Sequence, residues 1–211
     1  MPTIEQARAW YQGADAVHDF EHVLRVYRTA EKLAQTEGGD LEILRAAALL
    51  HDAEGTAPGG AARGSHHEQS AAFAEAILKE ESWSADRIAA VQHCIRAHRF
   101  RSTGEAPTTI EAKILFDADK LDVIGAIGVA RAIAYATLAR TPVYAPPSKS
   151  FLERGEREAG EPHSAFHEYV FKLSKIKDRL FTPSARALAQ ERHQFLAAYF
   201  ERLQEEYQNL R

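Results

Sequence analysis

The chain has 211 residues, of which 45% are hydrophobic, and its formal net charge at pH 7 is −4, so we do not expect nucleic acid as its partner. The single cysteine, Cys94, excludes an internal disulfide and a cysteine-rich zinc site. No run of about 18 apolar residues could span a membrane and no secretory signal opens the chain, so we expect one cytoplasmic domain over residues 1–211.

Helical periodicity recurs along the chain, and no segment shows the period-two alternation of a strand. Thr3, with Gln6 three residues later, is a capping-box signature for the first helix. Eight helices are predicted, over residues 3–11, 18–37, 41–50, 67–81, 84–98, 109–138, 164–180 and 183–209. The fold class is therefore all-α, a helical bundle with a core over about residues 18–138 and a C-terminal helical extension, about 163–209, that closes it.

Proline, glycine and charged residues dominate residues 141–162, so we expect a long connection there. Lys149, Arg154 and Arg157 could make it a basic lid over an anionic substrate. A solvated linker is the alternative.

His51 and Asp52 lie at the C-terminal end of the third predicted helix, just before a glycine-rich stretch that cannot continue the helix. Adjacent residues within a helix point about 100° apart and could not share an ion easily. At a helix end, an ion between the two side chains can be reached by both. An ordinary solvent-facing pair is the alternative reading of these two residues.

Two further groups have spacings that suit a metal ion. His18 and His22 are four residues apart and share a helix face, as metal ligands or as a surface pair. Asp119 and Asp122 share a face of the most apolar predicted helix, where a carboxylate needs a cation or several donors. An ion pair between Asp119 and Arg25 would also satisfy that need.

A set of imidazoles and carboxylates without sulfur suits Mn, Fe, Co, Ni or Zn, and Mg less well. A bound divalent ion lowers the pKa of its water from about 15.7 towards 7. Arg25, Lys120 and Arg131 are candidates for phosphate contacts, or are structural ion-pair partners. His98, at the end of its helix, either faces the site or caps the helix.

The order His…His-Asp…Asp resembles the HD-domain phosphohydrolase superfamily, in its branch of small bacterial hydrolases of about 200 residues. The resemblance rests on His18-Asp-Phe-Glu-His22-Val-Leu-Arg-Val26, on Ala48-Leu-Leu-His-Asp52 and on the run from Asp117 to Arg131. Lys172-Leu173, Lys177-Asp-Arg-Leu180 and Ala189-Gln-Glu-Arg192 extend it over nearly the whole chain.

The resemblance implies a metal site made by His22, His51, Asp52 and Asp119. It also implies that His18 supports a ligand or contacts substrate. Relatives usually carry an acidic residue three positions after the His-Asp pair, where this chain has Gly55, so Glu54 is the nearby alternative. The catalytic candidates are His18, Asp52, Glu54 and His98.

The implied activity is a divalent-metal-dependent phosphohydrolase with a small-molecule phosphate substrate, most naturally a nucleotide. The branch suggests nucleoside triphosphate pyrophosphohydrolysis. Two alternatives stay open: a nucleoside monophosphate phosphatase, and a non-catalytic sensor of metal or nucleotide. We expect no nucleic-acid or membrane partner, and a homodimer is the one protein partner considered.

Overall fold

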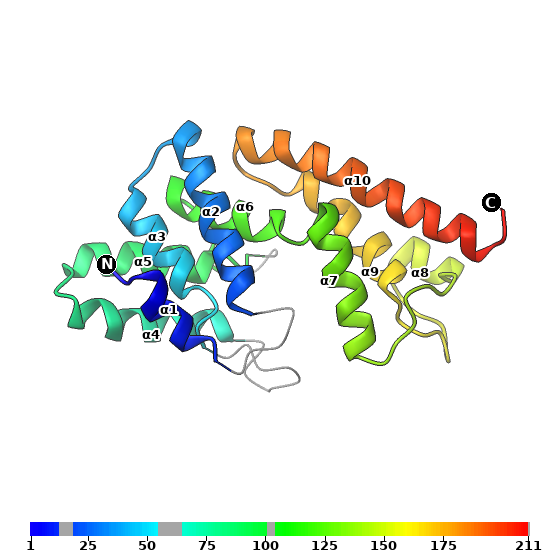
Figure 1. Cartoon of the computed structure of the whole chain (residues 1–211), viewed down its shortest axis with the longest axis horizontal. Coiled ribbons are helices and arrows are strands. Elements are labelled where there is room, and N and C mark those ends of the chain that lie inside the picture. The colour runs from blue at the N-terminus through cyan, green and yellow to red at the C-terminus, as the bar shows by residue number, and fades with distance from the viewer. Residues whose placement is uncertain (13–18, 55–64, 101–103, 211) are drawn as a thin grey trace. The chain divides into compact units, whose positions relative to one another are not determined.

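The computed structural model describes residues 1–12, 19–54, 65–100 and 104–210, which are drawn as ribbon in Figure 1. Over these residues the chain forms ten α-helices and one 3-10 helix and no strand, which confirms the all-α prediction. The helices are α1 (Ile4–Trp10), α2 (Phe20–Glu37), α3 (Leu41–Leu50), α4 (His66–Glu80), α5 (Ala85–Ala97), α6 (Ile110–Leu121), α7 (Gly125–Leu138), α8 (Lys149–Arg154), α9 (Ala165–Phe171), the 3-10 helix η2 (Leu173–Asp178) and α10 (Pro183–Tyr207).

The chain divides into two compact units, and each unit is made of two separate stretches of the sequence. The first unit comprises Met1–Asp119 and Leu180–Ala185, and the second comprises Lys120–Arg179 and Arg186–Arg211. The chain therefore leaves the first unit inside α6 and returns to it only for the short segment that opens α10. His22, His51, Asp52 and Asp119 all belong to the first unit.

Helix α3 is the centre of the first unit, because it packs against α1, α2, α4 and α5. Its sequence is rich in alanine and leucine, and six of its ten residues are buried. Small side chains let the neighbouring helices approach closely, so α3 is enclosed on several sides. The Asp40 carboxylate accepts hydrogen bonds from the amides of Glu42 and Ile43 and begins the helix.

The predicted continuous helix over residues 109–138 is wrong, because α6 ends at Leu121 and α7 begins at Gly125. Gly125 has φ +73°, a conformation that a side chain would strain. Arg192 donates from Nη1 to the carbonyl of Leu121 at 2.6 Å, which satisfies a group at the end of α6. A Cβ at position 128 would lie 2.4 Å from the carbonyl oxygen of Val123, so glycine is required there too.

The 141–162 segment is also more structured than the composition predicted. It contains α8, whose first turn is capped by the Ser148 hydroxyl, which accepts from the amide of Phe151. The basic side chains that we considered for a lid have partners in the segment: Lys149 lies near Glu153, and Arg154 pairs with Glu153 and Glu156. The predicted helix over 164–180 is divided into α9 and η2.

A buried histidine organises this part of the second unit. His167 is fully buried, with Nε2 2.9 Å from the Glu161 carboxylate and Nδ1 2.7 Å from the Ser164 hydroxyl. Glu161 also accepts from the amides of Ser148 and Glu158. Both ring nitrogens of His167 therefore have partners, and the cluster joins the two ends of the 148–164 segment.

The segment Leu180–Ala185 is held in the first unit by Asp117. That buried carboxylate accepts from the amides of Phe181 and Thr182 at 2.9 and 2.7 Å, and from the Thr182 hydroxyl at 2.7 Å. Among the described helices, none is by itself long and apolar enough to cross a bilayer, and only α6 and α7 taken together would reach that length and composition.

Candidate metal centre

His51 follows the last turn of α3 as its C-cap, and its ring is fully buried. Nδ1 lies 2.8 Å from the carbonyl oxygen of Ala48. Because a carbonyl only accepts, Nδ1 carries the proton and Nε2 of the neutral ring presents a lone pair. Nε2 is buried and has no hydrogen-bond partner among the described residues. A buried lone pair of this kind is costly unless a cation or a donor meets it.

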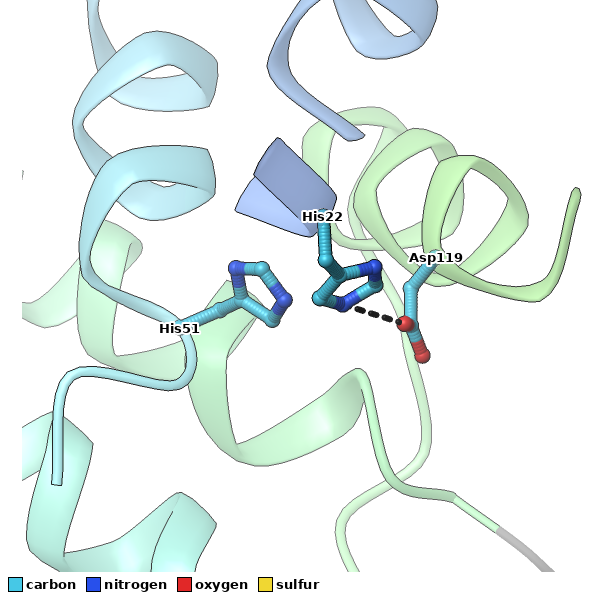
Figure 2. A group of neighbouring side chains, drawn as sticks. All are labelled: His22, His51 and Asp119. Carbon is cyan, nitrogen blue, oxygen red and sulfur yellow. Dashed lines mark ion pairs between the residues drawn. The ribbon is translucent and has the colours of Figure 1, made fainter. Parts of the chain in front are cut away.

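His22 and Asp119 lie opposite that lone pair, on α2 and α6 (Figure 2). His22 is 1% exposed, and its Nε2 is 3.5 Å from Oδ1 of Asp119, whose side chain is 14% exposed. One ligand atom from each of His22, His51 and Asp119 lies within 4.8 Å of the other two. Three segments that are far apart in the sequence thus bring two imidazoles and a carboxylate together.

Asp52 adds a second carboxylate to this group. Its Oδ2 lies 3.7 Å from Nε2 of His51 and 3.9 Å from Nε2 of His22. Although burial raises the pKa of the Asp52 carboxyl, the histidines around it, His51 first, hold that pKa well below its usual range. Asp52 is therefore a carboxylate at neutral pH, inside a site from which water is largely excluded.

The other oxygen of Asp52 faces a second pair of histidines. Oδ1 lies 3.3 Å from Nε2 of His66, the first residue of α4, and 3.6 Å from Nε2 of His98, the C-cap of α5. His98 repeats the arrangement of His51, since its Nδ1 lies 2.5 Å from the carbonyl oxygen of Ile95 three residues earlier. His98 is therefore both the C-cap residue of α5 and a neighbour of Asp52, and its role in the site stays a prediction.

The donor set suits a transition-metal ion. Two ligand atoms bonded at about 2.1 Å to one ion, with tetrahedral angles, lie about 3.4 Å apart. The distances of 3.5–3.9 Å around His22, His51 and Asp52 are close to that separation. Nitrogen and carboxylate oxygen without sulfur suit Mn, Fe, Co, Ni or Zn. The residues present therefore fit a divalent ion.

The other candidate residues do not all lie at this cluster of ligand atoms. His18 lies outside the described residues. Glu54 is exposed, and its backbone amide and carbonyl both bond the hydroxyl of Ser70. Arg25 lies one turn beyond His22 on α2 and is half-buried. Lys120 and Arg131 belong to the second unit, where Arg131 forms an ion pair with Asp122.

The sequence analysis missed two residues of this region. His66 contacts Asp52, and Nη1 of Arg99 lies 2.6 Å from Nδ1 of His66. The signal was weak: a histidine pair after a glycine-rich stretch, and an arginine directly after His98. Only the packing of α4 against α5 brings these residues together.

Comparison with known proteins identifies the family. A family model described as the HD domain matches residues 19–124, a range that includes His22, His51, Asp52 and Asp119. The chain belongs to the HD-domain family. It is 32% identical over 209 residues to the uncharacterized protein YpgQ of Bacillus subtilis, an alignment that covers 96% of this chain and 92% of YpgQ.

Solved structures of HD-family proteins match nearly the whole chain. The crystal structure of B. subtilis YpgQ in complex with ADP has a TM-score of 0.72 and 29% identity, and 97% of each chain is covered. A Lactobacillus plantarum protein has a TM-score of 0.76 and 27% identity, with 99% and 100% covered. An HD-superfamily hydrolase from Bacillus thuringiensis has a TM-score of 0.68 and 27% identity, and the match covers 97% of this chain and 96% of that one. The chain thus has the HD-superfamily hydrolase fold.

Proposed function

We propose that this protein is a metal-dependent phosphohydrolase that acts on a nucleotide or a similarly small phosphate ester. The observation that carries the proposal is the convergence of His22, His51 and Asp119, with Asp52 beside both histidines. Nε2 of His51 is buried and has no hydrogen-bond partner among the described residues. A histidine with a purely structural role would have a partner at both nitrogens.

These four side chains would hold one divalent ion. When bound, such an ion lowers the pKa of a coordinated water and neutralises negative charge on a phosphoryl oxygen. The chain's own contribution is positional: the carbonyls of Ala48 and, in the adjoining pair, Ile95 fix the tautomers and ring directions of His51 and His98. Asp52 supplies fixed negative charge from the middle of the group.

The substrate class is supported by the relative YpgQ, which was crystallised with ADP. A nucleoside diphosphate contains both parts of a nucleotide, the nucleoside and the phosphate chain, so it favours a nucleotide over a simple phosphate ester. We propose nucleoside triphosphates as substrates, cleaved to a monophosphate and pyrophosphate. Release of phosphate from nucleoside monophosphates is the alternative within the same chemistry.

Further residues have supporting roles in this proposal. Arg25 is on the same helix as His22 and is our first candidate for a phosphate contact. Lys120 directly follows Asp119 and is the second. Arg131 is less suited, because it forms an ion pair with Asp122. Glu54 and His98 are the candidates for orienting the attacking water, and His18 is retained as a substrate or ligand contact.

The experiment is a substrate and metal screen on protein that has first been freed of metal with a chelator. Nucleoside mono-, di- and triphosphates are each tested with Mn, Co, Ni, Zn and Mg, and the products are separated to distinguish orthophosphate from pyrophosphate. Reaction in water labelled with ¹⁸O identifies the phosphorus that is attacked. We expect the protein to hydrolyse nucleoside triphosphates with Mn or Co and to release pyrophosphate. Without metal we expect no hydrolysis.

The matched control is Asp119→Asn beside Asp178→Asn, since Asp178 is an exposed carboxylate of η2. Turnover should be lost in the first variant and kept in the second. A protein that binds metal and nucleotide but turns over no phosphate compound would contradict the proposal and favour the sensor.

A further inference from the structure

Helix α1 reaches the end of α3 through one hydroxyl group. Tyr11, the C-cap of α1, is 7% exposed, and its hydroxyl donates to the carbonyl oxygen of Leu49 at 2.9 Å. Leu49 lies in the last turn of α3, directly before the segment that carries His51 and Asp52. We infer that Tyr11 is a positioning residue, whose hydroxyl holds His51 and Asp52 in the geometry that binds a divalent ion. The inference rests on the metal centre of the proposed function.

The carbonyl groups at the end of α3 explain why this hydroxyl is needed. The last four carbonyls of an α-helix have no amide donor within the helix, and a buried one needs a donor from elsewhere. The carbonyl of Ala48 accepts from Nδ1 of His51 at 2.8 Å, and that of Leu50 accepts from a backbone amide at 3.3 Å. The carbonyl of Leu49, between these two, accepts from Tyr11. Three successive carbonyls thus have a donor each, and the donor to the middle one comes from α1.

The hydroxyl lies in an apolar setting, where water cannot easily replace it. Leu49 is 1% exposed. The buried cluster around it contains Ala7, Tyr11, Phe20, Val23 and Leu24. The rings of Tyr11 and Phe20 pack with their centroids 5.7 Å apart. A buried carbonyl that loses its donor costs free energy, so removal of the hydroxyl alone would disturb the last turn of α3 while the ring still packs.

The same hydroxyl oxygen also contacts Asp52. Burial raises the pKa of the Tyr11 hydroxyl well above its usual range, the Asp52 carboxylate adds to this, and a hydrogen bond from the backbone of Asp52 acts in the opposite sense. The hydroxyl therefore keeps its proton at neutral pH and donates to Leu49, while its oxygen accepts from the backbone of Asp52. Tyr11 thus bonds the main chain on both sides of His51.

These two hydrogen bonds fix two ligands at once. The direction of Nε2 of His51 follows from the hydrogen bond between its Nδ1 and Ala48, which lies in the same turn of α3 as Leu49. Asp52 is the next residue, and its Oδ2 lies 3.7 Å from Nε2 of His51. Ligand atoms that are held in place before an ion arrives lose less conformational freedom when it binds. Without the hydroxyl the last turn can move, and the ion should bind more weakly.

The test is Tyr11→Phe, which removes one oxygen atom and keeps the ring. Mn²⁺ is added to metal-free protein, and free Mn²⁺ is measured by electron paramagnetic resonance, so that the dissociation constant is obtained without a substrate. We expect an affinity about tenfold lower than that of wild type, within the range usual for groups that orient metal ligands. Circular dichroism and urea unfolding of the same samples establish that the variant is folded during the titration.

Tyr27→Phe is the matched control. Tyr27 packs against the same cluster from α2, the helix that carries His22, but its hydroxyl forms a hydrogen bond with the side chain of Glu31 and not with the end of α3. This variant also loses one hydroxyl from the edge of the cluster. Its Mn²⁺ affinity should equal that of wild type.

Three outcomes would overturn the inference. An unchanged Mn²⁺ affinity in Tyr11→Phe would overturn the positioning role and leave the metal centre intact. Equal weakening in Tyr11→Phe and Tyr27→Phe would also overturn it, because a general loosening of the cluster would then explain both. No Mn²⁺ binding by wild type would overturn the metal centre and the role of Tyr11 together. None of these measurements uses a substrate, so their result is independent of whether the protein hydrolyses nucleotides.

Discussion

Each of the two units buries a histidine completely, His51 in the first and His167 in the second, and their surroundings differ in one respect. Both nitrogens of His167 have partners, Glu161 and Ser164. Among the residues that the structure describes, His51 has a hydrogen-bond partner at Nδ1 alone, and its Nε2 faces other ligand atoms across a distance that suits an ion. The polar cluster of the second unit is thus satisfied by the chain, and that of the first unit is left open.

This difference separates a structural histidine from a functional one. Burial alone does not distinguish them, and neither does proximity to a carboxylate, because both histidines have those features. What distinguishes them is the hydrogen-bond inventory of each nitrogen. His51, whose Nε2 has no partner among the described residues, lies inside the stretch that matches the HD domain. His167, with partners at both nitrogens, lies outside residues 19–124.

The largest expected effect is on activity. Asp119→Asn keeps the size of the side chain but removes the charge that faces His22, so turnover should fall by more than about 100-fold, beyond the cost usual for groups that only support a ligand. Turnover is measured with the best nucleotide of the screen, beside circular dichroism. Glu161→Gln, which changes the closed cluster, serves as the comparison. Activity retained in Asp119→Asn would place the reaction elsewhere.

Replacing each buried histidine by leucine tests the comparison directly. In metal-free protein, His167→Leu should lower the free energy of unfolding by roughly 2–4 kcal/mol, because Glu161 and Ser164 lose their partner. His51→Leu should change it by less than about 1 kcal/mol, since only the hydrogen bond to the Ala48 carbonyl is lost and Nε2 has no partner among the described residues. Urea unfolding followed by circular dichroism measures both. Equal losses would show that the two clusters do not differ.

Metal should stabilise the first unit. Binding to the folded state alone adds about 1.4 kcal/mol to its free energy of unfolding when free Mn²⁺ is ten times the dissociation constant. Trp10 and Trp83, the two tryptophans of the chain, both lie in the first unit, so their fluorescence reports on it. The gain should be absent in Asp119→Asn. A gain of the same size in that variant would mean that the ion binds elsewhere.

The smallest effect is a pH dependence in the second unit. Burial raises the pKa of Glu161, but hydrogen bonds from the amide of Ser148 and from His167 outweigh it and lower that pKa to about 2. The pKa is lowered on folding, so its contribution to stability is complete above the unfolded value of about 4.3 and is lost as the pH falls towards 2.

Glu161→Gln should therefore be less stable than wild type at pH 7, and the two should converge as the pH is lowered from 5 to 2.5. Glu158→Gln is the control, because the exposed Glu158 contacts Glu161 through its backbone amide. Urea midpoints measured across this range decide the matter. A difference that stays constant with pH would contradict the lowered pKa.

Local patterns predicted much of the fold. Helix class, the capping box of Thr3 and Gln6, and the ends of α3 follow from side chains close together in the sequence. The break after Leu121 did not, because it depends on Arg192, which lies 71 residues away and satisfies the freed carbonyl. A Gly-x-x-Gly spacing was the only local sign of it.

The site shows the same division. His22, His51, Asp52 and Asp119 stand in recognisable motifs, and the structure brings them together. No motif marks His66 and Arg99, because only the packing of α4 on α5 brings His66 beside Asp52 and Arg99 beside His66. The structural part played by Asp117 was also hidden: it stands in the same run as Asp119, yet its oxygens accept from residues 64 and 65 positions later.

That contact of Asp117 with Phe181 and Thr182 has a consequence for biosynthesis. The first unit is not finished when the ribosome has made residue 119, because the donors that complete Asp117 emerge only with residues 181 and 182. All four proposed metal ligands are therefore synthesised before the unit that must hold them is complete. A nascent chain that stops short of residue 180 lacks these two donors to Asp117, so the first unit is completed only when roughly the last seventh of the chain is made.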